Sequence, residues 1–175
     1  MQSSRSSMVG ICVLLLAGGV AWSRPVAEIE VSSPSFRAGE PMPARFSYKG
    51  QNLSPELHIS NVPANARSLL LIVDDPDSPS GLWTHWLVWN IPANTTKIAE
   101  GAAPSGAMEG KNSFGHNRYD GPVPPSGTHR YFFRVYALDA PLTLSPDAGH
   151  DAVTQALANH VVGTGEFFGT YSATP

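Results

Sequence analysis

Acidic and imidazole side chains stand where three apolar runs of the sequence begin or end. Asp75 closely follows the apolar run 69–73, His85 opens the next run, and His129 opens a third. A carboxylate beside two imidazoles can hold a ring tautomer, accept from an ammonium group or help to bind an anion. These residue types therefore indicate a site for a small charged ligand, provided that the fold brings them together.

Three predicted strands would bring these side chains together. The runs Ser68–Val73, His85–Ile91 and His129–Leu138 have the length and residue types of buried strands. If the first strand is antiparallel to the other two, its end and their starts share one edge of a sheet. The carboxylate and the imidazoles then converge, and Tyr131, two residues beyond His129, points to the same face.

Two proline-rich loops would wall this site. The prolines would stiffen the backbone and the aromatic residues would add apolar surface. The residues expected there are Pro76, Pro79, Trp83, Tyr119, Pro124 and Pro125.

Plainer interpretations of these residues stay open. His85 could be a core histidine, His129 a loop residue and the Asp-rich segment an ordinary turn. His116, in a glycine-rich loop, is also left open.

Composition favours one β-rich domain. The chain has 175 residues, 16 glycines and 16 prolines, which indicates many turns and short strands. Only 14% of the residues are charged and the net charge is −3, which argues against a nucleic-acid-binding surface.

Further strands are expected near 26–31, 44–48, 57–59 and 166–171. A helix should begin at Ser145, as N-cap, and end before Gly163. The unpatterned segment 92–113 is expected to be a functional or surface loop.

Residues 1–23 have the pattern of a secretory signal peptide. Arg5 precedes an apolar stretch, 9–20, which is too short to span a bilayer, and Ala21-Trp22-Ser23 suits cleavage. The expected mature domain is 24–175, periplasmic or secreted, with no transmembrane anchor after cleavage. A lipoprotein attached through Cys12 is the weaker alternative, because Ile11 stands where a small residue is wanted.

Several motifs resemble the phosphatidylethanolamine-binding protein family, and the compact loops resemble its bacterial, Raf-kinase-inhibitor-like branch. The two main blocks are Asp75-Pro76-Asp77-Ser78-Pro79 with Trp83-Thr84-His85-Trp86, and Gly127-Thr128-His129-Arg130-Tyr131. Further similarity lies in 50–57, in Tyr119-Asp120-Gly121-Pro122 and in 165–171. The similarity spans most of the expected mature chain.

The resemblance implies a mainly β fold, an antiparallel β-sandwich of a large sheet on a smaller one with one or two peripheral helices. It also implies a pocket for phosphate or phosphorylated head groups. The matching positions are Asp75, His85, His129 and Tyr131, with Trp83, Pro79, Pro124 and Pro125 as walls. Animal members carry a tyrosine just before the tryptophan, where this chain has Ser80-Gly81-Leu82. They also have a C-terminal helix near the pocket, whereas this sequence ends soon after its last expected strand.

The sequence thus favours a non-enzymatic protein that binds a small anionic or zwitterionic ligand, such as phosphate or phosphoethanolamine, without a cofactor. An inhibitor or regulator of a protein partner, a kinase or protease bound through the same pocket or its rim, is the second hypothesis, and a homodimer is left open. A metal-assisted hydrolase built on Asp75, His85 and His129 is the third. The chain lacks the close metal-ligand spacing and the nucleophile motif that would favour it.

Overall fold

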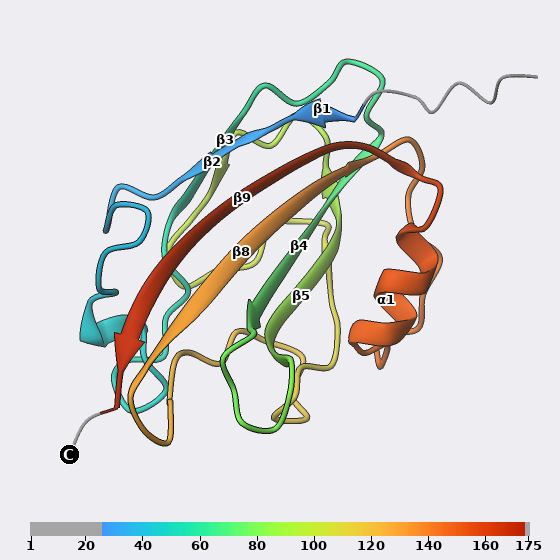
Figure 1. Ribbon diagram of the computed structural model, residues 1–175. Helices are drawn as coiled ribbons and strands as arrows, with labels where there is room; N and C mark the ends of the chain where they lie inside the picture. The colour runs from blue at the N-terminus through green and yellow to red at the C-terminus, as the bar shows by residue number, and fades with distance from the viewer. Residues whose placement is uncertain (1–25, 174–175) are drawn as a thin grey trace, which may run out of the picture.

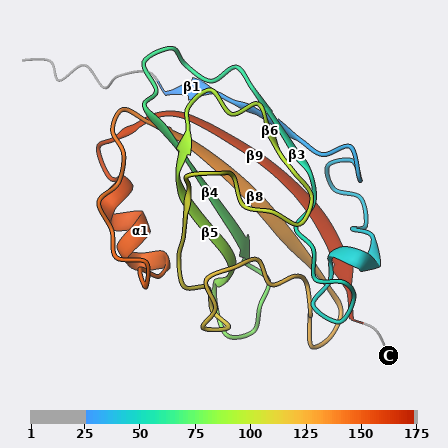
Figure 2. The ribbon, with the colours of Figure 1, turned by 180° about the vertical axis from the view of Figure 1, so that it is seen from behind.

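Two β-sheets of unequal size form the body of the molecule in the computed structural model, which describes residues 26–173 (Figure 1). The larger sheet has six strands in the order β1-β9-β8-β4-β5-β7, and the smaller has three in the order β2-β3-β6. In Figure 2 the β3 and β6 segments lie across the large sheet, opposite the side that carries α1. The predicted mainly β architecture, with a large and a small sheet, is confirmed. The signal-peptide prediction lies outside the described residues.

Most neighbouring strands of the large sheet are antiparallel. The strands of this sheet are β1 Ala27–Glu28, β4 Ser68–Asp75, β5 Trp83–Pro92, β7 Met108–Glu109, β8 Thr128–Leu138 and β9 Val161–Ser172. Only the short β1 pairs in parallel with its neighbour β9 among the described strands. The small sheet consists of β2 Glu30–Ser32, β3 Leu57–Ser60 and β6 Lys97–Ile98.

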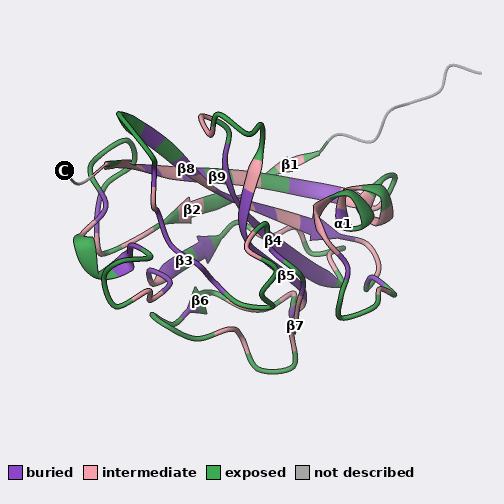
Figure 3. Ribbon diagram, turned by 90° about the horizontal axis from the view of Figure 1, so that it is seen from below, coloured by how far each residue is buried: buried purple, intermediate pink, exposed green. Residues whose placement is uncertain are grey.

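The central strand β4 is buried on both faces, which explains its unbroken apolar run. Leu69, Leu71 and Val73 contribute to the core between the sheets. Leu70 and Ile72 contribute to a second core that includes Val153 of the helix α1 His150–Leu157. A strand that is covered on both sides needs apolar residues at successive positions rather than at alternate ones. Figure 3 shows this as continuous burial along β4.

Four sequence-based element predictions were wrong in detail. Residues Ala44–Phe46 form a 3-10 helix and not a strand. The α-helix begins at His150 with Gly149 as N-cap, because Ser145 instead starts a tight turn in which Ala148 N–H donates to its carbonyl. The chain turns extended at Val161, so Gly163 lies within β9 and does not terminate the helix. Segment 92–113 contributes β6 and β7 to the two sheets.

Register places the candidate residues at one end of the large sheet. The strand β4 is antiparallel to both β5 and β8, as predicted, with Asp75 opposite Trp83 and Asp74 opposite Phe132. The loop between β4 and β5 and the chain that enters β8 therefore lie at the same end of the molecule, as Figures 1 and 2 both show.

Candidate functional site

A cavity of about 170 Å³ opens at this end of the sheet. Its lining comes from the end of β4, the start of β5, the start of β8 and the two loops between them. The lining residues are Asp75, Ser78, Pro79, Ser80, Trp83, His85, Phe114, Val123, Pro124, Pro125 and His129. Seven of the eight positions that the family resemblance implied for the pocket lie on this lining, and the eighth, Tyr131, does not. Pro76, also expected in the wall, is not on the lining either.

Asp75 and His129 form a buried pair on the lining. The Nδ1 atom of His129 lies 2.7 Å from Oδ2 of Asp75, and the two side chains are 8% and 5% exposed. The other carboxylate oxygen accepts a hydrogen bond from the backbone N–H of Asp77 at 2.8 Å. Both oxygens of Asp75 are thus engaged, and the carboxylate orients the imidazole ring.

His85 is held by a backbone carbonyl rather than by a carboxylate. Its Nδ1 atom lies 2.5 Å from the carbonyl oxygen of Asp120, and its ring packs edge-on against Phe114 and Tyr131. Burial lowers the pKa of His85, outweighing the hydrogen bond to the Asp120 carbonyl and the charge of Asp75, which act in the opposite direction. The ring is therefore neutral at about pH 7.

The Asp120 side chain anchors the loop that supplies this carbonyl. It is fully buried, and it accepts hydrogen bonds from Asn52, Asn112, His116 and Arg118. Burial alone would raise the pKa of Asp120, but the hydrogen bonds, led by that from Asn112, lower it. His116, which the sequence left open, belongs to this anchor and does not line the cavity.

Tyr131 lies beside the cavity without lining it. Its ring centroid is 5.1 Å from that of His85, and the side chain is 1% exposed. Among residues 26–173 its hydroxyl is the one buried side-chain polar atom without a well-formed hydrogen bond, although the Asp75 carboxylate and the Val123 backbone lie near it. Burial, followed by the negative charge of Asp75, raises the pKa of the phenol, so it stays a neutral donor.

Two further aromatic residues differ from the sequence-based expectation. Tyr119 was expected in the pocket wall, but it lies in the core against Trp86, and its hydroxyl donates to the Phe46 carbonyl. Its place is taken by Phe114, which contacts both Trp83 and His85 and was not predicted. An aromatic residue at the start of a glycine- and proline-rich loop was the available signal.

Adjacent carboxylates of β4 serve opposite faces of the sheet. Asp75 faces the cavity, whereas Asp74 accepts from Thr84 at 2.8 Å and from Arg134 at 3.3 Å on the side of α1. Burial raises the pKa of Asp74, although Thr84 and the nearby cations oppose this. The Asp-rich segment is therefore divided between a site and a structural ion cluster.

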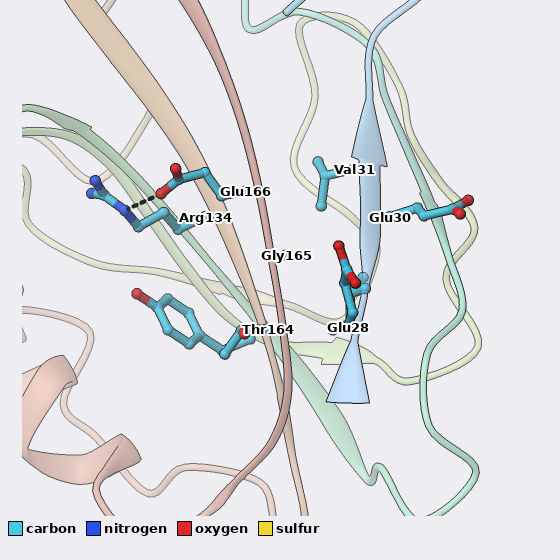
Figure 4. A pocket seen from close by; sticks show the side chains of 9 residues that line it. Glu28, Glu30, Val31, Arg134, Thr164, Gly165 and Glu166 are labelled. Atoms are coloured by element: carbon cyan, nitrogen blue, oxygen red, sulfur yellow. Dashed lines mark hydrogen bonds and ion pairs between the residues drawn. The ribbon is translucent and has the colours of Figure 1, made fainter. Parts of the chain in front are cut away.

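A larger hollow, of about 640 Å³, lies elsewhere, along β9 (Figure 4). Its arginine, Arg134, is already bound to Glu166 at 3.0 Å and to Asp74, and Glu28 and Glu30 add further negative charge. It offers no unpaired cation to an anion, so it is a poor candidate for the expected ligand.

The described part of the chain, 26–173, holds no group of three His, Cys, Asp or Glu side chains placed as metal ligands. Within the same residues, no helix has the length and apolarity needed to cross a membrane.

Comparison with known proteins places the chain in a family. The sequence model of the phosphatidylethanolamine-binding protein family matches residues 32–172. A UPF0098 protein of Methanothermobacter thermautotrophicus is 47% identical over 135 residues, covering 74% of this chain and 89% of that protein. A Mycobacterium tuberculosis protein named as a lipoprotein, LppC, is 41% identical over 84% of this chain and 74% of its own length.

Solved structures agree. A phosphatidylethanolamine-binding protein homologue from Chlamydia trachomatis superposes with a TM-score of 0.80 at 38% identity, covering 84% of this chain and 99% of that one. Escherichia coli YbcL, described as a member of the mammalian family, gives 0.80 at 32% identity, with 85% and 100% covered. The chain therefore belongs to the phosphatidylethanolamine-binding protein family.

Proposed function

We propose that this protein binds a small phosphate-containing ligand, such as phosphoethanolamine or inorganic phosphate, in the 170 Å³ cavity. The observation that carries this proposal is the convergence of Asp75, His85 and His129 on one small lining. A few polar groups on the lining of a mostly apolar, pre-formed cavity are typical of small-ligand sites. Membership of a family named for a phosphorylated lipid supports the choice of ligand.

Isothermal titration calorimetry tests this directly. Phosphoethanolamine and inorganic phosphate are titrated into the purified chain 24–175. We expect saturable binding of at least one of them, and a loss of at least tenfold in affinity in His129→Ala. Exposed His58, on β3, provides the control, and His58→Ala should bind as the parent does. No binding by the parent protein, or equal binding by His129→Ala, overturns the proposal.

Binding without turnover is part of the same proposal. No serine, threonine or cysteine side chain forms a hydrogen bond with His85 or His129 among the described residues. An activated nucleophile paired with a base is therefore lacking on this lining. Phosphatase and esterase assays on the purified protein, with and without added zinc, should show no activity that His129→Ala abolishes; such an activity would contradict this part.

A second candidate function is regulation of a protein partner through the rim of the cavity. Leu82, 49% exposed, precedes Trp83 of the lining, and Tyr48, 39% exposed, stacks on Phe114 with centroids 5.1 Å apart. Exposed apolar side chains beside a pocket are typical of contact surfaces. Affinity capture with the parent chain and with Leu82→Ser separates this from ligand binding, since only a rim contact should be lost in the variant.

We also propose that the protein is exported. The apolar stretch 9–20 and the small residues before position 24 support this, as does a relative named as a lipoprotein. Cell fractionation and N-terminal sequencing of the expressed full chain test it. Export is expected to give a mature chain that starts at Arg24, and retention of residues 1–23 in the cytoplasm would contradict it.

A further inference from the structure

The hydrogen-bond partners of the two histidines decide which ring nitrogen carries a proton. The Asp120 carbonyl can only accept, so Nδ1 of His85 is the protonated nitrogen. The carboxylate of Asp75 likewise accepts from Nδ1 of His129. Both rings thus use Nδ1 for these hydrogen bonds, which leaves the second nitrogen, Nε2, as the one available to a ligand. In a neutral imidazole this nitrogen is an acceptor.

The side of the cavity formed by Asp75, His85 and His129 is poor in donors, whereas Ser78, Ser80 and Trp83 carry donor groups on the side of the β4–β5 loop. The imidazole side presents one carboxylate and two acceptor nitrogens, which repel the oxygens of a fully deprotonated anion. A phosphate group that contacts both rings therefore needs one additional proton. The surroundings of the two rings decide whether a ring or the ligand carries that proton.

His85 and His129 differ in how well their surroundings stabilise a positively charged ring. Protonated His129 would be compensated at once by the Asp75 carboxylate, 2.7 Å from its Nδ1. His85 has the Asp120 carbonyl rather than a carboxylate at its Nδ1, with the Gly121 carbonyl nearby. Its burial against Phe114 and Tyr131 disfavours the charged form and outweighs the opposing charges of Asp75 and Asp120. His129 is thus the ring that becomes a donor, and His85 remains an acceptor.

No other charged group changes this assignment. The Asp120 carboxylate is occupied by its four donors, and Asp77 is bound by Arg130 at 2.7 Å. From β9, Tyr171 pairs across the strands with His129, and from β8 the neutral phenol of Tyr131 flanks His85. The carboxylate of Asp74 makes its contacts on the other face of the sheet.

We propose that the pocket selects a phosphate group that still carries one proton. His129 donates to one phosphate oxygen through Nε2, and Nε2 of His85 accepts a hydrogen bond from the P–OH group. Asp120 is the positioning residue, because its carbonyl keeps His85 in the accepting tautomer. The ligand class is the singly protonated phosphate monoester or free phosphate, in preference to phosphodiesters and sulfonates. This deepens the proposed function and rests on it.

A pair of ligands of equal shape and charge tests the selection. At about pH 6, methylphosphonate retains a P–OH group and methanesulfonate does not, while both are largely monoanions. We expect methylphosphonate to bind at least tenfold more tightly by calorimetry. Equal or tighter binding of methanesulfonate overturns the inference, as does binding of neither when phosphoethanolamine binds. If neither phosphoethanolamine nor inorganic phosphate binds, the proposed function itself is overturned.

A variant of the accepting ring supplies the second arm. Glutamine at this position can turn an amide N–H toward the ligand, so His85→Gln should reduce the preference for methylphosphonate to about threefold or less. His58→Gln, at an exposed histidine of β3, should keep the full preference. A full preference in a folded His85→Gln protein contradicts the role of His85.

A measurement on the unaltered protein guards against a variant that does not fold. Binding of phosphoethanolamine at about pH 7.5 is titrated in two buffers of different ionisation enthalpy, since its phosphate is then mostly a dianion. The observed heats should differ by an amount that corresponds to uptake of roughly one proton per ligand bound. Heats that are independent of the buffer would overturn the inference while leaving the proposed function intact.

Discussion

The Nδ1 atom of His129 lies 2.7 Å from Oδ2 of Asp75, and both side chains are almost completely buried. The pair joins the end of one central strand to the start of its neighbour, so it links fold and site. The carboxylate can hold the imidazole in place without any charge on the ring, but it stabilises the imidazolium much more strongly. Phosphate binding through His129 should therefore depend on the charge of Asp75.

The substitution Asp75→Asn tests that dependence. It keeps an acceptor for Nδ1 of His129 but removes the negative charge. We expect affinity for phosphoethanolamine to fall at least tenfold, because a positively charged ring loses its partner. Calorimetry on the parent and the variant is the measurement. Unchanged affinity would show that the charge is not used.

Tyr131→Phe separates stability from binding. The hydroxyl is buried and makes no well-formed hydrogen bond among residues 26–173, so removing it should leave the unfolding free energy unchanged or raise it by about 1 kcal/mol. If the hydroxyl is reserved for the ligand, affinity should fall in the same protein. Urea unfolding and calorimetry give the two values. A clear loss of stability would reveal a hydrogen bond that the hydroxyl makes in the folded chain.

The sequence was sufficient to predict that the candidate residues gather at one end of the sheet. Long apolar runs defined β4, β5 and β8, and their antiparallel order brought Asp75, His85 and His129 together. Periodicity was enough here because these strands are long and their boundaries coincide with a change in residue type.

Details that depend on tertiary contacts could not be predicted in this way. Tyr119 and Phe114 lie in one loop, and only the packing of that loop decides which ring enters the core and which lines the cavity. The roles of Asp74 and Asp75 differ because alternate residues of a strand face opposite sides. The helix start at His150 was missed because Ser145 also suits a turn, and local signals do not distinguish the two.

The loop between β4 and β5 is fastened to β8 by Asp77 and Arg130. Two side-chain hydrogen bonds, of 2.8 and 2.7 Å, and one from the Arg130 backbone N–H hold this carboxylate. The hydrogen bond from the Arg130 side chain is the main cause that lowers the pKa of Asp77 to about 2. Because the folded-state pKa is below the unfolded value, the ionised pair stabilises the fold above about pH 4.

This stabilisation should disappear as the pH falls from about 4 through about 2, when Asp77 becomes protonated in the folded state as well. Asp77→Asn should therefore flatten the stability curve in that range and have its largest deficit near neutral pH. It should also weaken ligand binding, because Ser78, Pro79 and Ser80 of the same loop line the cavity. Urea unfolding at several pH values checks the first effect. An acid limb as steep as that of the parent would contradict it.

On the opposite face, Arg134→Met tests the ion cluster around Asp74. Arg134 compensates a carboxylate that is 3% exposed and whose pKa burial already raises. Without the guanidinium, that pKa rises further, and keeping Asp74 ionised in the folded state becomes more costly. We expect a loss of about 1–3 kcal/mol in unfolding free energy near neutral pH.

The sign of the pH dependence distinguishes this mechanism from a simple loss of packing. A raised folded-state pKa destabilises the fold above the unfolded pKa of about 4, and the penalty vanishes below it, where Asp74 is protonated in both states. The loss of unfolding free energy in Arg134→Met should therefore become smaller as the pH is lowered from about 7 to 4. The ion pair of Asp77 in the parent protein behaves in the opposite way, since its stabilisation is lost as the pH falls. Arg67→Met, an arginine outside this cluster, serves as the control. A deficit that stays constant with pH would assign the effect of Arg134 to its contacts with Phe132, whose ring centroid lies 4.7 Å from its guanidinium carbon.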